Sequence, residues 1–113
     1  MILPTPQTLA RHGLSESDYI RLWEFQGGRC GVCNRPPAKA GRLVIDHCHR
    51  TKQVRGLVHP LCNGKLGKVQ DNVTWLDGAA AYLRDPPASR CGITALSRAS
   101  NGNKRRRRRT SSK

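Results

Sequence analysis

Two pairs of metal-binding residue types share one spacing in this sequence. Cys30 and Cys33 enclose two residues, His59 and Cys62 also enclose two, and 25 residues separate the pairs. Structural zinc takes four Cys or His ligands in a tetrahedron, and such a gap lets both members of a pair reach one ion. We therefore predict one structural Zn²⁺ ion bound by these four side chains. The alternative is a set of ordinary buried thiols beside an unrelated histidine.

A polar cluster lies between the two pairs. Asp46, His47 and His49 follow the apolar residues 43–45, and Asn63 comes directly after the last predicted zinc ligand. Zinc would hold both neighbourhoods together, so that Asp46 and Asn63 offer oxygen ligands beside an imidazole. Such oxygens suit a hard ion such as Mg²⁺, and an imidazole takes a proton from water at neutral pH. These groups could hydrolyse a phosphodiester, whereas the alternative is a solvated hairpin tip.

Several segments are expected to position these residues. Ser15 and Asp18 have the spacing of a capping box, and apolar residues follow at helical intervals until two glycines. Two short stretches rich in β-branched residues flank a polar turn and predict a hairpin. Pro60 suits the first turn of a helix. The expected elements are a helix over 16–26, strands within 42–48 and 54–58, a helix from about residue 60, and a helix over 73–84.

The composition excludes several classes of protein. The chain has 113 residues, 21 Lys and Arg against 7 Asp and Glu, a formal net charge of +14 and five cysteines. A chain this short forms at most one ordinary domain with a small core. No apolar run approaches the ~20 residues that span a bilayer, so we expect no membrane partner and a soluble, cytoplasmic protein. The cysteines favour metal binding over disulfides, and the charge favours nucleic acid.

The positive charge is concentrated at the C-terminal end. Residues 91–113 contain eight Lys and Arg and no acidic residue. From Ser97 onward the sequence has no apolar residue able to offset the entropy of folding. We predict an N-terminal segment over 1–14, a zinc-stabilised domain over 15–88 and a disordered basic tail over 89–113.

The motifs together resemble the recombination endonuclease VII family. The similar residues are Gly28–Cys33, the run Leu43–Gly67, and Asp71 with Asn72, and the resemblance as a whole covers about residues 15–76. The resemblance is specific because two metal pairs, D-H-x-H, V-R-G-L and C-N occur in the right order. This family belongs to the HNH nucleases and is found especially in bacteriophages. The resemblance implies a small α+β fold, namely a zinc-stabilised ββα-metal (HNH, His-Me finger) domain with flanking helices.

The resemblance also implies roles for the polar residues. His47 falls on the general base that activates water, and His49 falls on the second active-site histidine, which acts either at the metal or at the scissile phosphate. Asp46 and Asn63 fall on the ligands of a catalytic Mg²⁺ or Mn²⁺ ion. The four predicted zinc ligands fall on the structural zinc positions of the family, where the third ligand is usually Cys and is His59 here.

The predicted function is therefore metal-dependent cleavage of DNA by an endonuclease. Basic residues of the hairpin and the tail are expected to contact phosphates, although Arg55 could equally brace the hairpin. These residues are Arg50, Lys52, Arg55, Lys104, Arg105, Arg106, Arg107, Arg108 and Arg109. The alternatives are a non-catalytic zinc-stabilised DNA-binding protein and a nuclease that acts on RNA. Monomer and homodimer both stay open.

Overall fold

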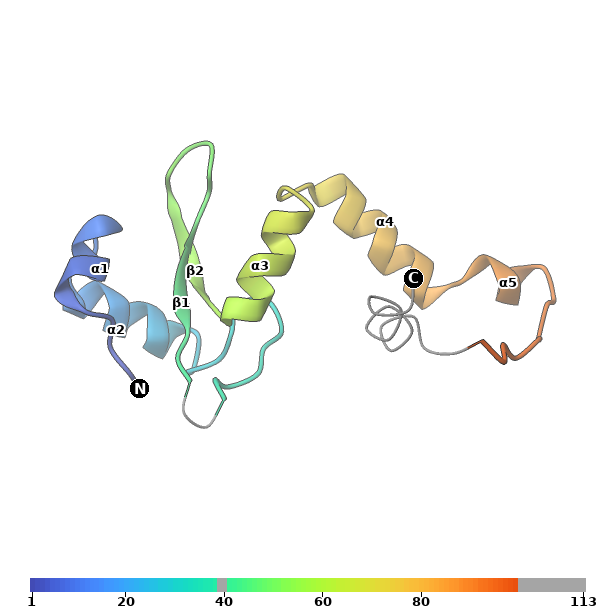
Figure 1. Cartoon of the computed structure of the whole chain (residues 1–113), viewed down its shortest axis with the longest axis horizontal. Helices are drawn as coiled ribbons and strands as arrows, with labels where there is room; N and C mark the ends of the chain where they lie inside the picture. Colours follow the sequence, from blue (N-terminus) through green and yellow to red (C-terminus); the bar gives the residue numbers. More distant parts are fainter. Residues whose placement is uncertain (39–40, 100–113) are drawn as a thin grey trace, which may run out of the picture. The chain divides into compact units, whose positions relative to one another are not determined.

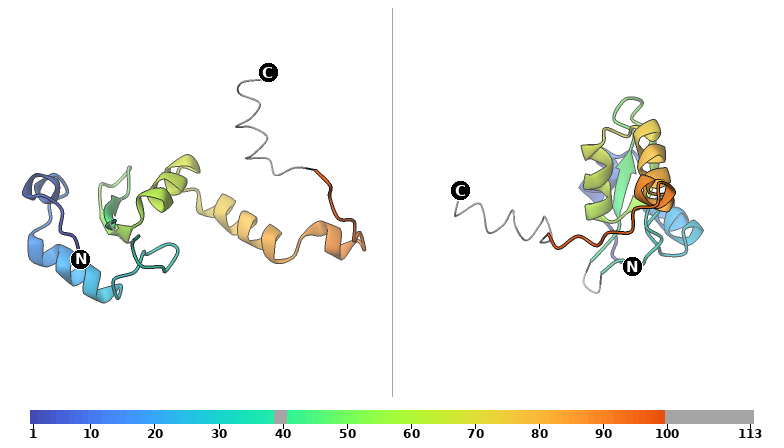
Figure 2. Two further views of the ribbon diagram at one scale, coloured as in Figure 1. Left: turned by 60° about the horizontal axis from the view of Figure 1, so that its bottom comes forward. Right: turned by 90° about the vertical axis from the view of Figure 1, so that its right-hand side faces the viewer.

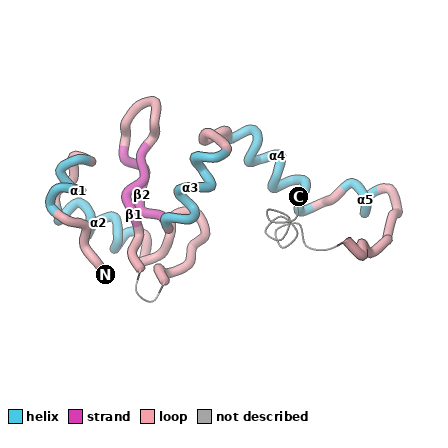
Figure 3. The backbone as a smooth tube through the Cα atoms, in the orientation of Figure 1, coloured by secondary structure: helices cyan, strands magenta, loops and turns pink. Residues whose placement is uncertain are grey.

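The computed structural model describes residues 1–38 and 41–99. These residues form five helices and one two-stranded antiparallel sheet, in two units, Met1–Val73 and Thr74–Lys113. In chain order the elements are α1 (Pro6–Arg11), α2 (Glu16–Phe25), β1 (Val44–His47), β2 (Val54–Val58), α3 (Pro60–Lys68), α4 (Val73–Arg84) and α5 (Pro87–Arg90) (Figures 1 and 3). The small α+β fold predicted from the sequence is confirmed, with the hairpin and the three expected helices in place.

Helix α2 begins with the capping box that the sequence predicts. The Ser15 hydroxyl accepts a hydrogen bond from the Asp18 N–H at 3.1 Å, and the Asp18 carboxylate accepts one from the Ser15 N–H at 3.0 Å. These bonds lower the pKa of Asp18 below its ordinary value of 3.8. Further along, Tyr19 is fully buried, and its hydroxyl donates to the Leu43 carbonyl at 2.8 Å. The ring fills the core while its polar tip is satisfied, which joins α2 to the start of β1.

A short helix, α1, precedes α2 and was not expected from the sequence. Its N-terminus nevertheless has the usual signals. Thr5 caps the helix by accepting a hydrogen bond from the Thr8 N–H at 3.2 Å, and Pro6 occupies the first turn. Leu9 is only 6% exposed and packs into the hydrophobic core. Helix α1 is therefore part of the first folded unit.

The hairpin has one register irregularity. Asp46 on β1 opposes Gly56 on β2, but the next residue, His47, opposes Val54. Arg55 is thus an extra residue in β2, which forms a β-bulge. A bulge bends its strand and changes the direction in which neighbouring side chains point. The irregularity lies at the two residues, Asp46 and His47, that the sequence indicates as functional.

Gln26, the C-cap of α2, covers the outer edge of β2. Its side-chain NH₂ donates to the Leu57 carbonyl at 2.8 Å and to the Arg29 carbonyl at 2.7 Å, while its side-chain oxygen accepts the Leu57 N–H at 2.9 Å. The Gly31 N–H also donates to the Leu57 carbonyl, at 2.9 Å. A Cβ at residue 56 would lie only 3.0 Å from the Gln26 side-chain oxygen, so the glycine leaves room for the Gln26 side chain. The Gln26 side chain therefore pairs with the N–H and C=O groups of Leu57, as the backbone of a neighbouring strand would.

The hydrophobic core of the first unit is small and surrounds the hairpin. Helix α2 packs against β2 and α3 packs against β1, so the hairpin lies between two helices (Figures 1 and 2). The buried core residues are Leu9, Tyr19, Cys30, Leu43, Ile45, Leu57 and Val58. Because few apolar side chains are buried, a bound metal ion would contribute a large share of the stability.

The second unit contains most of α4 and all of α5. Helix α4 ends at Arg84, as the range predicted from the sequence has it, and Pro86 and Pro87 follow directly after Asp85. Helix α5 includes residue 89, where the basic tail was expected to begin. The predicted arginine run, Lys104–Arg109, lies outside the described residues. Within residues 1–38 and 41–99, no helix is both long and apolar enough to cross a membrane.

Candidate active site and metal centre

Four candidate ligand atoms converge where the two predicted metal pairs meet. Cys30 and Cys33 lie in the turn after α2, whereas His59 and Cys62 lie at the start of α3. One ligand atom from each residue lies within 4.8 Å of all the others. The sulfur of Cys33 is 3.1 Å from Nδ1 of His59, and the sulfur of Cys62 is 4.0 Å from the same atom. The predicted cluster is confirmed, and three sulfurs with one imidazole nitrogen form a site that could hold zinc.

The surroundings of His59 and Cys30 favour the forms of these two side chains that bind metal, whereas burial, with the hydrogen bonds and charges of Cys30 and Cys33, raises the pKa of Cys62 to about 11. Nε2 of His59 lies 2.8 Å from the Pro36 carbonyl, which can only accept, so Nε2 carries the proton and Nδ1 presents a lone pair. The backbone N–H groups of Val32 and His59 each donate to the Cys30 sulfur at 3.3 Å. Burial raises the pKa of Cys30, but hydrogen bonds from these groups and from Cys33 lower it to about 6. The residues present therefore fit zinc.

The four predicted catalytic residues line one cavity of about 330 Å³. Asp46 and His47 lie at the end of β1, His49 lies in the hairpin turn, and Asn63 lies in the first turn of α3. The centroids of the His47 and His49 rings are 5.3 Å apart, and the ring planes are tilted by 47°. The other lining residues are His12, Val44, Ile45 and Pro60. A carboxylate, an amide and imidazoles thus meet in one space, as the sequence led us to expect.

Arg55, the bulge residue, holds the carboxylate of Asp46. Its Nε and one terminal nitrogen donate to the two carboxylate oxygens at 2.8 and 3.0 Å, and it also pairs with Asp71 at 3.3 Å. Asp46 is only 6% exposed, so this two-pronged contact restricts its orientation. The hydrogen bond to Asp46, helped by Asp71, raises the pKa of Arg55 above its ordinary value. The sequence allowed Arg55 either to contact phosphate or to brace the hairpin, and the structure shows the bracing contact, to Asp46 on the opposite strand.

Asp46 and Asn63 could supply oxygen ligands to a divalent ion of the magnesium type. A carboxylate has about four lone-pair positions, so Asp46 can still accept from the cavity side after its two bonds to Arg55. Asn63 is exposed and lines the same cavity. Mg²⁺ commonly takes one or two protein oxygens and completes its shell with water and substrate phosphate. In the described part of the chain, only the zinc-type cluster brings together three or more Cys, His or acidic ligands. A divalent ion in the cavity would therefore need water and substrate phosphate as further ligands.

His12 also lines the cavity, although the sequence analysis did not identify it. It is the C-cap of α1, and its ring centroid lies 5.5 Å from that of His47 with an interplanar angle of 57°. Burial lowers the pKa of His12 below its ordinary value of 6.5, and the nearby charges of His47 and Arg11 add to this effect. No motif surrounds His12. The sequence signal that could have indicated His12 is indirect: Thr5 and Pro6 mark the start of α1, the helix that ends at His12.

The hairpin turn carries the predicted phosphate contacts Arg50 and Lys52, and both are exposed. Cys48 lies just after β1, where its sulfur accepts a long hydrogen bond of 3.5 Å from the Thr51 N–H. Thr51, through its side chain and then its backbone, lowers the pKa of Cys48 to about 7. The turn thus presents cations and one easily ionised thiol close to the cavity.

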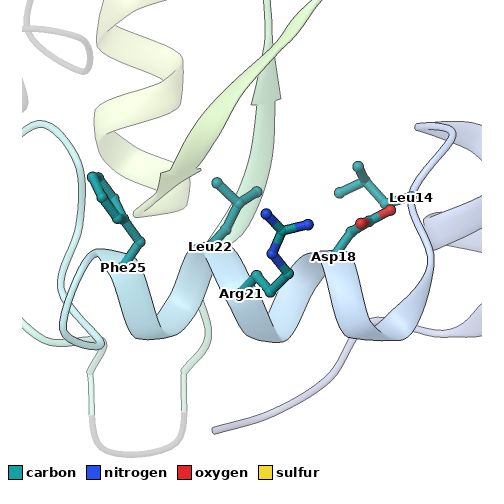
Figure 4. A pocket seen from close by; sticks show the side chains of 5 residues that line it. All are labelled: Leu14, Asp18, Arg21, Leu22 and Phe25. Carbon is teal, nitrogen blue, oxygen red and sulfur yellow. The ribbon is translucent and has the colours of Figure 1, made fainter.

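A larger cavity, of about 470 Å³, lies along α2. Figure 4 shows its lining side chains, which are Leu14, Asp18, Arg21, Leu22 and Phe25. Asp18 already serves the capping box, and neither a cysteine nor a histidine lines this space. Volume alone therefore does not identify the functional site, and the chemistry of the residues favours the polar cavity.

A four-residue cluster suited to zinc beside a polar cavity is the arrangement of a zinc-stabilised α+β domain. Comparison with known proteins assigns the family: the sequence model of recombination endonuclease VII matches residues 6–85, and this chain belongs to that family. Two similar curated proteins are both named "Gene 59 protein". That of Mycobacterium phage D29 is 46% identical and that of Mycobacterium phage L5 is 43% identical, each over 81 residues.

The aligned part covers 71% of this chain and 49% of each phage protein, so the chain spans about half the length of these relatives. No solved structure matches the chain.

Proposed function

We propose that this chain is a metal-dependent DNA endonuclease of the HNH, or ββα-metal, type. The observation that carries the proposal is that Asp46, His47 and Asn63 line one cavity beside a cluster suited to zinc. Membership of the recombination endonuclease VII family supports nuclease activity, and β1, β2 and α3 follow one another in ββα order. A non-catalytic zinc-stabilised DNA-binding protein would need the cluster and the positive charge, but it would have no use for this carboxylate, amide and imidazole together.

His47 is the proposed general base. Its ring takes a proton from a water molecule in the cavity, and the water oxygen attacks the scissile phosphorus in line with the leaving 3′ oxygen. The bond between phosphorus and that oxygen breaks, and the leaving oxygen takes a proton from water, which gives 5′-phosphate and 3′-hydroxyl ends. His49, whose ring centroid lies 5.3 Å from that of His47 and which lines the same cavity, is the proposed contact of the scissile phosphate.

Asp46 and Asn63 are the proposed ligands of the catalytic ion. When bound, Mg²⁺ or Mn²⁺ supplies positive charge that stabilises the transition state and the leaving oxygen. Arg55 keeps the Asp46 carboxylate in one orientation through its two hydrogen bonds. Asp71 in turn holds Arg55 at 3.3 Å, which connects the turn after α3 to the site.

The zinc ion is proposed to be structural. Four protein ligands leave no open position for water, so the ion would link the turn after α2 to the start of α3. Asn63 directly follows Cys62, and β2 ends directly before His59. Closing the cluster would therefore fix Asn63 relative to Asp46 on the neighbouring strand.

DNA is the proposed substrate. The exposed side chains of Arg50 and Lys52, with the run Lys104–Arg109, are proposed to bind backbone phosphates. Contacts of this kind add affinity and position the strand without reading its sequence. The proposed chemistry needs one chain for one cut and is the same for a monomer and a homodimer.

A cleavage assay tests the proposal. We expect the wild type to nick or linearise supercoiled plasmid in Mg²⁺ or Mn²⁺, and we expect His47→Ala to be inactive while Gln7→Ala, a change on the exposed surface of α1, stays active. A panel of linear duplex, single-stranded DNA, four-way junction and RNA then identifies the substrate class. Full activity of His47→Ala would reject the proposed base, and cleavage of RNA alone would reject DNA as the substrate.

A further inference from the structure

A second cavity adjoins the candidate active site. It has a volume of about 410 Å³ and is lined by Arg11, His12, His47, Lys52 and Val54. His12 and His47 also line the first cavity, so the two spaces share these residues as a wall. A strand that passes the proposed base in the first cavity would therefore continue into the second.

The second cavity has a cationic lining. Arg11 supplies a guanidinium and Lys52 an ammonium, and no carboxylate is among the lining residues. Within residues 1–38 and 41–99, the ion pairs involve Arg55 and Arg90, and neither Arg11 nor Lys52 takes part in one. Arg11 donates one long hydrogen bond, to the Thr8 hydroxyl at 3.3 Å. Two cations that border a cavity without an acidic partner favour an anionic ligand.

The backbone fixes the position of both cations. Arg11 ends α1, which is anchored through the buried Leu9. Lys52 has a φ of +70°, and its N–H donates to the Cys48 carbonyl at 2.7 Å to close the hairpin turn. Glycine and asparagine adopt this left-handed conformation more easily than lysine does. The turn thus holds Lys52 in an uncommon backbone conformation, and its side chain lines the second cavity.

We propose that Arg11, His12 and Lys52 bind the DNA backbone phosphate next to the scissile one. The inference rests on the proposed nuclease function, because it places the cut strand across His47 from one cavity into the other. A guanidinium donates to phosphate oxygens in a planar fork, an imidazole N–H adds one donor, and an ammonium adds charge. Holding the flanking phosphate sets the register of the strand, so that the scissile phosphate lies at His47.

The test removes both cations in the variant Arg11→Gln with Lys52→Asn. Glutamine preserves helix propensity, and asparagine tolerates the positive φ, so both changes are compatible with the fold. The matched control, Arg21→Gln with Lys68→Asn, also removes one arginine and one lysine charge, but from positions that line neither of these two cavities. His12 stays unchanged, because its ring contacts His47 and its loss would disturb the proposed base as well.

The ligand is a short DNA duplex in which one phosphate at a time is replaced by an uncharged methylphosphonate. Fluorescence anisotropy measures binding without added divalent ion, so that the strand is not cut. At one position, neutralisation should weaken binding by the wild type and the control about tenfold, and it should weaken binding by the double variant much less, because only the His12 donor of that contact is left. Mapping of the wild-type cut in Mg²⁺ should place this phosphate beside the cleaved bond.

Two results would overturn the inference. In the first, neutralising each phosphate weakens binding equally in the wild type and the double variant. In the second, the phosphate whose neutralisation affects the two proteins differently lies far from the cleaved bond. If one phosphate is coupled to Arg11 and Lys52 and no strand is ever cut, the phosphate site stands and the proposed nuclease function is wrong. The two proposals can therefore fail separately.

Discussion

The hydrogen bonds of Gln26 to β2 can be removed with little change in packing. Gln26→Met keeps a side chain of similar length but removes three bonds: two from the side-chain NH₂, to the Arg29 and Leu57 carbonyls, and one from the Leu57 N–H. The Leu57 carbonyl keeps its bond to the Gly31 N–H. The Leu57 N–H, in a residue that is fully buried, loses its acceptor. An unsatisfied buried donor costs about 1–3 kcal/mol, and an ordinary hydrogen bond contributes about 1 kcal/mol.

We therefore expect Gln26→Met to lower the free energy of unfolding by about 2–3 kcal/mol. For a domain of this size the melting temperature should fall by at least about 8 °C. Circular dichroism during heating, with zinc in fixed excess for every sample, measures this change. The control Gln7→Met makes the same substitution on the exposed surface of α1, and we expect a shift of less than about 2 °C. Equal melting temperatures for the two variants would refute the role of Gln26 at the edge of β2.

Three further predictions concern the same fold. Tyr19→Phe removes the donor to the Leu43 carbonyl and should cost about 1–3 kcal/mol in denaturant unfolding, whereas an unchanged midpoint would contradict the buried bond. Because folding lowers the pKa of Asp18, its carboxylate stabilises the protein above pH 3.8 and loses this effect as the pH falls through the folded pKa. The stability difference between wild type and Asp18→Asn should therefore shrink in acid, and a difference that stays constant with pH would exclude this capping role. Removal of zinc by a strong chelator should unfold the first unit, and a metal-free protein with an unchanged circular dichroism spectrum would refute a structural zinc site.

The metal cluster, the hairpin and the start of α2 were predictable because each depends on residues that are close in sequence. Two-residue gaps bring Cys30 and Cys33, or His59 and Cys62, within reach of one ion. The capping box at Ser15 depends on a spacing of three residues. The meeting of the two metal pairs then required only that the hairpin between them fold back on itself.

The contacts that complete the site were not predictable, because they depend on packing between distant segments. Alternation of residue types does not reveal the bulge at Arg55, which decides that this side chain reaches Asp46. His12 reaches His47 only because α1 packs on the core. The bonds of Gln26 to Leu57 likewise join residues that no local pattern connects.

In the proposed function, the Cys and His cluster stabilises the domain through zinc while His47 acts as the catalytic base. Zinc content and plasmid nicking, measured on the same preparations of wild type, His47→Ala and Cys33→Ser, test it most directly. We predict that His47→Ala binds one zinc ion per chain and nicks at least about a hundredfold more slowly than wild type, whereas Cys33→Ser loses both zinc and fold. Nicking by His47→Ala at the wild-type rate, with zinc bound, would contradict the assignment of His47 as the base.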